Sequence, residues 1–418
     1  MRPKLTPMAS LPSHAAGRRQ FLQRSAALGG LGLLGGCATT AAEPPATLHF
    51  REPPRLAPAN IRADRIMGIT VCLRPFRAAG PRLDAETVGG KLVVHNYGHG
   101  GSGWSLGWGS ALIAVKTALS GGERDIAVLG CGALGLTAAT VAQQAGARVT
   151  IYAKEQLPDA RSARATGVWS PDSRIALAGS VDPRFPALWE DMARRSFRMH
   201  QQYLGLADAP VEWTDRYILS DAPTTAGPDP LGFAHYADRL RDLTPRSERL
   251  ERDQHPFPVA YARRATLPMF NITGYGHTLM NDFRLAGGRF ELREFHAPAE
   301  LASLPQKVII NCTGYGARAL WKDESVVPVR GQIAWLVPQP EVTYGVIYKG
   351  VSTVSRRDGL GVQVVGPDDG YGYNDANEAM DRAESETGIA TLAPLFSSPS
   401  RSAAGPARRT GGRAAAGT

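Results

Sequence analysis

The stretch IAVLGCGALGLTAATVAQQAGARVTIYAKE, Ile126–Glu155, decides the fold. An apolar strand, IAVLG, leads into the turn GCGALG; a helix then runs to Gly146, and RVTIYA follows as a second apolar strand. In such a turn the first glycine allows the sharp bend, the second lets a pyrophosphate approach the backbone, and the third lets helix pack on strand, while the helix N-terminus attracts phosphate. The stretch therefore predicts a βαβ dinucleotide-binding unit, with contacts from Gly130, Gly132, Leu134 and Gly135.

The end of the second strand bears on which dinucleotide binds. An acidic residue is expected there to bind the ribose hydroxyls, and Glu155 is the candidate. Lys154 directly precedes it, and a basic side chain at this tip favours the 2′-phosphate of NADP instead. A nicotinamide-dependent oxidoreductase is therefore one alternative.

A second glycine-rich stretch, VVHNYGHGGSGWSLGWGSA, Val93–Ala111, lies ahead of this unit. Glycine permits positive φ and lets the backbone approach a ligand with no Cβ in the way. A strand-like LVV precedes the run and a helix-like SALIAVKTAL follows it, so we expect the glycines to lie against a flat cofactor. His95 and His99 are interpreted as residues that hold the loop rather than as catalytic bases.

Both stretches resemble motifs of the D-amino-acid oxidase family of flavoproteins. INCTG (Ile310–Gly314), VRGQI (Val329–Ile333) and LRPFR (Leu73–Arg77) resemble further motifs of that family. The resemblance implies FAD as the cofactor and an α/β fold, in which a Rossmann-like FAD-binding domain with a parallel sheet adjoins a substrate domain with an antiparallel sheet. The further FAD contacts that it implies are Gly100, Gly101, Gly103, Ser105, Ser162, Gly167, Trp169, Thr313 and Gly314.

The resemblance also implies an activity, the oxidation of D-amino acids to imino acids that hydrolyse to 2-oxo acids. Arg74 is expected to bind the substrate carboxylate, because a planar guanidinium holds a carboxylate through two hydrogen bonds. The carbonyl of Gly101 is expected to face the amine, and Tyr348 and Tyr344 are expected to supply lid hydroxyls. Hydride transfer from Cα to the flavin then requires orientation but no side-chain base. A catalytically degenerate flavoprotein fold that serves as a binding module is a second alternative.

The motifs stand in an unusual order. In the family the LRPxR strand, the HNYGHGG turn and a last helix close the chain, whereas here they precede the nucleotide-binding strand. We therefore predict a circular permutant whose old ends are joined by the polar linker Ser120–Asp125. The predicted parts are a signal peptide (1–37), a Pro/Ala-rich tether (38–62), a permuted FAD-binding core (63–170), a mainly helical substrate region with returning strands (171–306), a return to the FAD domain (307–330), substrate-domain strands and a helix (331–396), and a disordered basic tail (397–418).

The first 37 residues predict export. Arg18 and Arg19 form a twin-arginine pair, and the apolar run Ser25–Gly36 is too short to span a bilayer. Leu34–Cys37 resembles a lipoprotein cleavage box, so we expect a periplasmic protein attached to the membrane only through a lipid on Cys37. The expected oxidant is oxygen, with peroxide as product, or a respiratory-chain acceptor in the membrane.

The formal net charge of +9 arises at the two ends of the chain. Residues 1–37 carry five basic residues and residues 397–418 carry four, with no acidic residue in either, so the chain between them is neutral overall. We therefore expect no nucleic-acid partner. The four cysteines show no metal-ligand spacing, so no metal site is expected, and Cys72, Cys131 and Cys312 are predicted to be buried free thiols.

Overall fold

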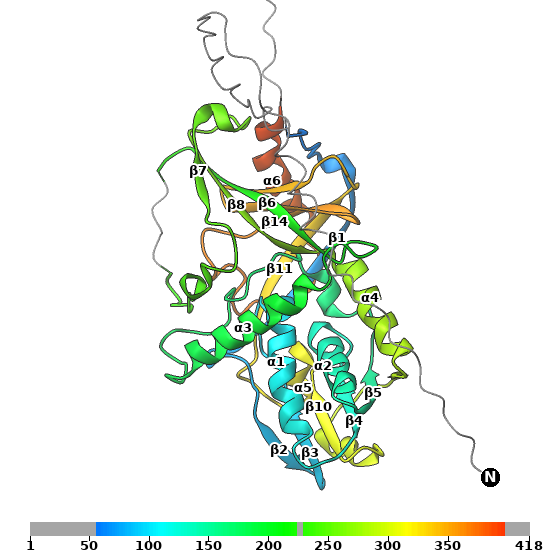
Figure 1. The fold of residues 1–418 in the computed structure, drawn as a ribbon. Coiled ribbons are helices and arrows are strands. Elements are labelled where there is room, and N and C mark those ends of the chain that lie inside the picture. The colour runs from blue at the N-terminus through cyan, green and yellow to red at the C-terminus, as the bar shows by residue number, and fades with distance from the viewer. Residues whose placement is uncertain (1–55, 224–228, 398–418) are drawn as a thin grey trace, which may run out of the picture. The chain divides into compact units, whose positions relative to one another are not determined.

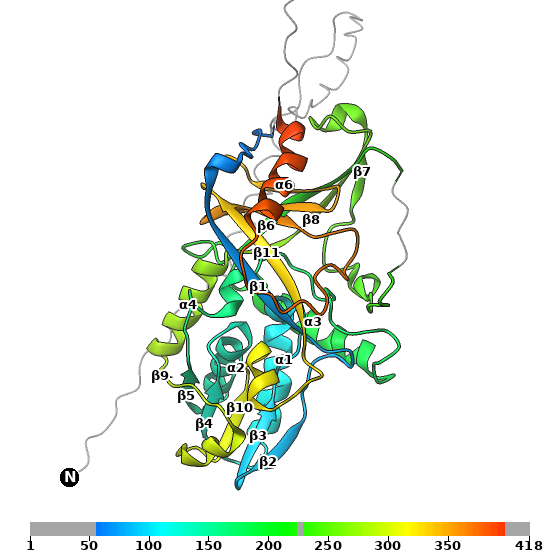
Figure 2. The ribbon, with the colours of Figure 1, turned by 180° about the vertical axis from the view of Figure 1, so that it is seen from behind.

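The computed structural model describes residues 56–223 and 229–397, in which two β-sheets are covered by helices (Figures 1 and 2). The predicted signal peptide, Cys37, the tether up to residue 55 and the basic tail from residue 398 lie outside the described residues. None of the helices in the described part of the chain combines the length and apolar character needed to cross a membrane.

The smaller sheet has six strands in the order β2-β3-β10-β4-β5-β9. Neighbouring strands are parallel, except that β2 and β3 are antiparallel. The helix α2 (Ala133–Gln144) joins β4 to β5, as the βαβ pattern predicts. The strands are β2 (Ala85–Val88), β3 (Lys91–His95), β4 (Asp125–Leu129), β5 (Arg148–Ala153), β9 (Arg289–Leu292) and β10 (Val308–Asn311).

Three helices bury one face of this sheet: α1 (Gly103–Ala118), α2 and α4 (Ile272–Leu285). The fourth long helix, α3 (Phe185–Gln201), packs on α1. Glycine makes this contact possible, because a Cβ on Gly109 would overlap the backbone of Met192 in α3. The opposite face of the sheet is covered by apolar residues around a 3-10 helix, Pro298–Ser303. Both faces are thus buried, which explains why the central strands are continuously apolar.

The larger sheet has eight strands in the order β1-β11-β14-β13-β12-β6-β8-β7. Its pairings are antiparallel apart from β12 with β6, which are parallel. The strands are β1 (Ile66–Phe76), β6 (Val211–Ser220), β7 (Glu248–Leu250), β8 (Tyr261–Phe270), β11 (Val327–Leu336), β12 (Tyr344–Tyr348), β13 (Val351–Arg356) and β14 (Gly359–Val364). The short α5 (Ala317–Leu320) follows β10, and α6 (Arg382–Leu392) lies against this larger sheet.

The two faces of the eight-stranded sheet carry different side chains, because successive residues of a strand point to opposite faces. The α6 face holds an apolar cluster that includes Tyr217, Leu336 and Val362 and packs against α6. The other face, here called the cavity face, includes Arg74, Gly331 and Gln363 on β1, β11 and β14. This second face positions the candidate site.

The structure differs from the predicted parts at two places. The predicted FAD-binding core, 63–170, includes β1, yet β1 belongs to the eight-stranded sheet because it pairs with β11 almost along its whole length. The predicted tether, 38–62, overlaps residues that are packed: Ala59 and Ile61 are buried in the cluster under α6. Apolar side chains inside a Pro/Ala-rich segment are enough to dock it.

Candidate active site

A cavity of about 850 Å³ lies between the carboxyl ends of the parallel strands and the cavity face of the larger sheet. Its size is typical of a cofactor site, for which volumes of roughly 300–1,000 Å³ are usual. Both glycine-rich turns line this one cavity. The predicted residues that line it are Arg74, Gly100, Gly101, Gly103, Gly130, Gly132, Leu134, Lys154, Glu155, Ser162, Thr313 and Gly314.

The glycine positions of the GCGALG turn leave no room for side chains. Gly130 has φ +99°, and a Cβ there would lie 2.6 Å from the carbonyl oxygen of Cys312. A Cβ on Gly135 would overlap the carbonyl of Gly130, so this residue packs helix on strand and does not line the cavity. The hydroxyl of Ser162 accepts a hydrogen bond from the amide of Ala133 at 3.0 Å, in the first turn of α2. The turn therefore presents backbone and a helix N-terminus to the cavity.

The HGG turn is pressed against the loop at residues 173–174. The amide of Gly101 donates to the carbonyl of Ser173 at 3.0 Å, and a Cβ on Gly100 would overlap the carbonyl of Arg174. Gly103 differs, because a Cβ there would meet no protein atom within 4 Å although the residue lines the cavity. The first two glycines thus serve packing, and Gly103 leaves the cavity open.

Arg74 projects from β1 onto the cavity face. Its Nη1 donates to the carbonyl oxygen of Arg330 at 3.0 Å, and a Cβ on Gly331 would lie 2.5 Å from the same nitrogen, so a larger residue at 331 would displace the guanidinium. No carboxylate of a described residue lies within 4 Å of it. Desolvation, with repulsion from Arg174, lowers the pKa of Arg74 to about 10. The cavity therefore contains a cation that forms no ion pair within 4 Å with a described carboxylate, although the more distant Asp369 partly stabilises it.

The two histidines of the HNYGHGG turn occupy different surroundings. His99 lines the cavity, is 1% exposed, and has no hydrogen-bond partner at either ring nitrogen among the described residues. Burial lowers its pKa to about 3, so its imidazole is neutral at physiological pH. His95 lies outside the cavity, where its Nε2 is 2.7 Å from the carboxylate of Glu86 and its Nδ1 is 3.0 Å from the side-chain amide nitrogen, Nδ2, of Asn311.

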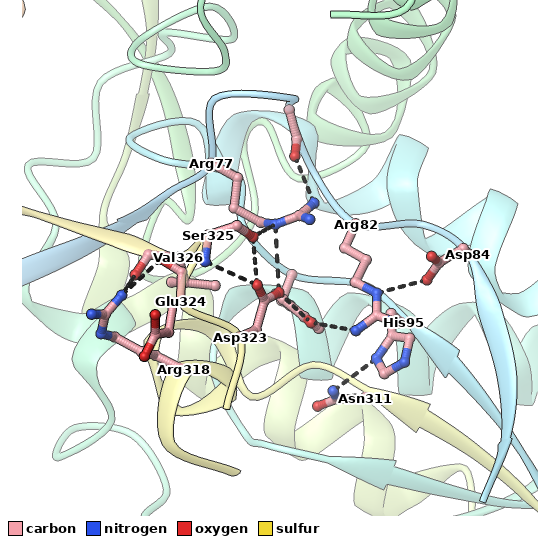
Figure 3. A network of polar contacts seen from close by, with 12 residues as sticks. Arg77, Arg82, Asp84, His95, Asn311, Arg318, Asp323, Glu324, Ser325 and Val326 are labelled. Atoms are coloured by element: carbon pink, nitrogen blue, oxygen red, sulfur yellow. Dashed lines mark hydrogen bonds and ion pairs between the residues drawn. The ribbon is translucent and has the colours of Figure 1, made fainter. Parts of the chain in front are cut away.

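Figure 3 shows the polar network in which His95 lies. Arg77, the second arginine of LRPFR, lies in this network and does not line the cavity: its Nε donates to Ser325 at 2.9 Å and lies 3.6 Å from Asp323. The carboxylate of Asp323 also accepts from the hydroxyl of Tyr97 at 2.8 Å. The two arginines of one motif thus have separate positions, one at the cavity and one in a structural network.

The far end of the cavity is formed by the residues after β5, β9 and β10. Glu155 lines it, and the ammonium of Lys154 lies 3.5 Å from the carboxylate of Glu294. Thr313 donates its hydroxyl to Asn311 at 2.8 Å, and Gly314 has φ +56° in a place where a Cβ would meet no atom within 4 Å. The lysine on which the NADP alternative depended is therefore already paired with an acid.

Several predicted residues do not reach the cavity. Ser105 accepts a hydrogen bond from the amide of Ser170 at 2.9 Å, and Trp169 is buried among the helices on the smaller sheet. Gly167 has φ +87°, and a Cβ there would overlap the carbonyl of Phe270. These three residues therefore pack and hydrogen-bond within the loops next to the cavity, without lining it.

The two predicted lid tyrosines also lie elsewhere. Tyr344 donates its hydroxyl to the carbonyl of Ala57 at 2.7 Å, and Tyr348 donates to Asp221 at 2.9 Å. Both belong to the cluster under α6, because β12 turns these positions to the α6 face and Gly345 and Ile347 to the cavity face. The placement of Tyr344 and Tyr348 at the cavity was therefore wrong by one position in the strand alternation.

Sequence reasoning missed several cavity residues. Arg161 and Arg164 flank the predicted Ser162, and both line the cavity. Arg161 forms a two-bond ion pair with Glu378, 2.8 Å for each bond. Their position beside Ser162 was the available signal. Gln363, also at the cavity, carried no such signal, since only the pairing of β14 with its neighbours brings it there.

Comparison with known proteins gives similarities along much of the chain. The model of the DAO family, described as FAD dependent oxidoreductase, matches residues 125–415. A D-amino-acid oxidase of Streptomyces coelicolor is 32% identical over 219 residues, which cover 50% of this chain and 59% of that protein. A D-amino-acid oxidase of Rubrobacter xylanophilus is 28% identical over 211 residues, which cover 49% of this chain and 57% of that protein.

The chain thus spans less than two thirds of the length of these curated relatives. Among solved structures, iminodiacetate oxidase from Chelativorans sp. BNC1 aligns with a TM-score of 0.44 at 16% identity, covering 65% of this chain and 78% of that one.

Proposed function

Because the chain belongs to the family of FAD-dependent oxidoreductases, we propose that it oxidises D-amino acids to imino acids. FAD is the cofactor. When bound, it supplies a two-electron acceptor for the hydride of the substrate Cα. The relatives named as D-amino-acid oxidases support the choice of substrate.

The residues around the cavity fit FAD. The GCGALG turn cannot hold side chains at Gly130 and Gly135, and it presents the N-terminus of α2, where a pyrophosphate is stabilised by backbone amides. Gly103 and Gly314 line the cavity and leave open space where a Cβ would stand. The unpartnered ring nitrogens of His99 face the same buried region. A planar polar group placed there would satisfy them.

The proposal depends most on one observation, the position of the Arg74 guanidinium at the cavity without an ion-pair partner. A desolvated guanidinium without a protein carboxylate is costly, and a substrate carboxylate would compensate it. Bidentate binding would also fix the direction of the substrate, with its amine toward the carbonyl of Gly101. The amine lone pair forms the C=N bond as hydride leaves Cα, and water then releases ammonia and a 2-oxo acid. In this scheme the protein orients the substrate and needs no side-chain base.

The test compares two arginines of one motif. We expect Arg74→Met to lower kcat/KM for neutral D-amino acids by about 100-fold or more, because two charge-assisted hydrogen bonds are lost and each is worth about 1.5–3 kcal/mol. Visible flavin absorbance should be retained. Arg77→Met is the control: it lies outside the cavity, so substrate kinetics should stay within a few-fold while stability falls. Equal losses in both variants, or loss of flavin from Arg74→Met alone, would contradict the proposal.

Export and the final oxidant are part of the same proposal. The twin arginines Arg18 and Arg19 and the lipobox-like Cys37 support a periplasmic lipoprotein that passes electrons to oxygen or to a respiratory-chain acceptor. Replacing both arginines with lysine should leave the protein in the cytoplasmic fraction. An unchanged distribution between fractions would exclude this route.

A further inference from the structure

A second arginine, Arg216, lies on the cavity face of the eight-stranded sheet. It is on β6, opposite Gly345 of β12, and directly paired residues of neighbouring strands point to the same face. Ile218, two residues after Arg216, points to the same face. It pairs with Ile347, which pairs with Ser352, and Ser352 pairs in turn with Gln363, which lines the cavity. The neighbours of Arg216 in sequence, Asp215 and Tyr217, point to the opposite face.

The side chain of Arg216 crosses the sheet toward the cavity. The Cγ of Arg216 lies 3.7 Å from where a Cβ on Gly345 would stand, so the arginine side chain packs over this glycine of β12. Its Nη2 donates to the hydroxyl of Ser352 at 2.7 Å, two strands away on β13. Ser352 stands directly opposite Gln363 in the register. The guanidinium therefore ends one strand from the wall of the cavity.

The charge of Arg216 has no partner in the described part of the protein. Desolvation lowers the pKa of three described arginines, Arg74, Arg174 and Arg216. Arg174 is compensated by Asp369 at 3.2 Å, but the ion pairs of the described residues include neither of the other two. The Nε of Arg216 is buried and has no hydrogen-bond partner among the described residues. Its pKa falls only to about 10, so the group remains a cation at neutral pH.

Arg216 is partly buried and no described carboxylate compensates its charge, so an anion bound beside it would be favourable. On the basis of the proposed function, we propose that Arg216 and Ser352 receive a second carboxylate of the substrate, so that the enzyme prefers dicarboxylic D-amino acids. Arg74 then holds the α-carboxylate and Arg216 the side-chain carboxylate. The two remain distinct positions on one face of the sheet, which selects substrates by charge and length.

Matched substrates test this preference. D-Glutamate and D-glutamine differ only in the charge of the side-chain end, and we expect the full-length enzyme to favour D-glutamate in kcat/KM. Arg216→Met should lower kcat/KM for D-glutamate by about 10- to 100-fold, which is the range for losing a hydrogen bond to a charged group. The same variant should leave D-glutamine within a few-fold. Arg216→Lys keeps the charge and should keep the preference for D-glutamate.

Binding provides a readout that needs no turnover. Glutarate and butyrate, which carry two and one carboxylates, are titrated into the flavin-loaded protein while the visible flavin spectrum is recorded. Tighter binding of glutarate that is lost in Arg216→Met but kept in Arg216→Lys supports the inference. Ser352→Ala should weaken glutarate alone, and to a smaller extent than Arg216→Met. This variant keeps the test valid if Arg216→Met fails to fold.

The outcomes separate the two proposals. If kcat/KM is equal for D-glutamine and D-glutamate, or if Arg216→Met lowers kcat/KM for both substrates equally, the inference about Arg216 is overturned and the proposed function stands. If no D-amino acid is oxidised, the proposed function fails. In that case equal affinity for glutarate and butyrate would also overturn the inference, and a preference for glutarate that depends on Arg216 would support it.

Discussion

At the scale of single residues, the arginines differ in whether their charge is compensated within the protein. Arg77 is held by Ser325 and Asp323, and Arg174 by Asp369, so their charges are compensated within the protein. Arg74 and Arg216 have carbonyl or hydroxyl partners and no carboxylate within 4 Å among the described residues. Backbone and hydroxyl oxygens position a guanidinium but leave its net charge in place. The uncompensated arginines are therefore the ones that we assign to ligands.

A buried histidine away from the cavity predicts how stability depends on pH. His200 is 0% exposed, its Nδ1 is 3.0 Å from the hydroxyl of Tyr275, and burial lowers its pKa to about 3. In the unfolded chain the pKa is about 6.5, so unfolding takes up a proton between these values. Stability from this residue is complete above pH 6.5 and is lost as the pH falls toward 3.

We therefore expect His200→Phe to flatten the acid limb of the stability curve. The slope of unfolding free energy between pH 6.5 and 4 should fall by up to about 1.4 kcal/mol per pH unit, the value for one proton. Urea unfolding at several pH values measures it, with His277→Gln at an exposed position as the control. An unchanged slope in His200→Phe would show that His200 does not resist protonation in the folded state.

At the scale of elements, glycines in and after the two glycine-rich turns leave out side chains. A side chain there would occupy the cavity or would prevent two elements from packing. The helix α1 illustrates both uses within a few residues. A Cβ on Gly109 would overlap the backbone of α3, whereas a Cβ on Gly103 would enter open space at the cavity. Packing therefore requires Gly109, and we expect cofactor binding to require Gly103.

This difference predicts the effect of Gly103→Leu. The added side chain meets no protein atom at its Cβ and stands in the first turn of α1, where leucine is a better helix former than glycine. We expect the apoprotein to unfold at an unchanged or higher temperature while flavin affinity falls at least tenfold. Gly121→Leu, in an exposed turn with equal space around its Cβ, is the control for flavin affinity. Retained affinity in Gly103→Leu would place the flavin elsewhere.

At the scale of the whole molecule, the predicted circular permutation requires chain ends and a linker that lie outside the core. The segment before residue 120 supplies β1 to the larger sheet, and β3 and α1 to the smaller one. Leu56 and Phe396, near the two described ends, pack against the same cluster under α6. The predicted linker Ser120–Asp125 runs through a largely exposed turn after α1 and ends at the first residue of β4. Termini and linkers at such places can be exchanged without disturbing a core.

A reordered chain tests the predicted circular permutation. Residues 123–397, followed by a short Gly/Ser linker and then residues 56–119, restore the order of motifs that the resemblance implies. We expect this chain to fold and to bind flavin, as shown by circular dichroism and visible absorbance. A second permutant, opened inside α2 between Thr140 and Val141, cuts a buried helix and should not fold. Failure of the first permutant together with success of the second would refute the prediction.

The sequence by itself determined the βαβ unit, both glycine turns and the position of Arg74 in its motif. These features are local. Neighbouring residues alone determine a turn without room for Cβ atoms or a strand followed by a helix. The family match at residues 125–415 agrees with the cofactor and the fold class that they implied.

Only the tertiary structure decided which side chains share the cavity. The lid tyrosines were misplaced because a shift of one residue in a strand exchanges its two faces, and the face of β12 is set by its pairing with β6 and β13. Arg216 was not predicted at all, since its partner Ser352 is 136 residues away and its lack of a carboxylate among the described residues is a property of the packed protein. Strand register and uncompensated charge are long-range quantities, so they became visible only when the sheet was assembled.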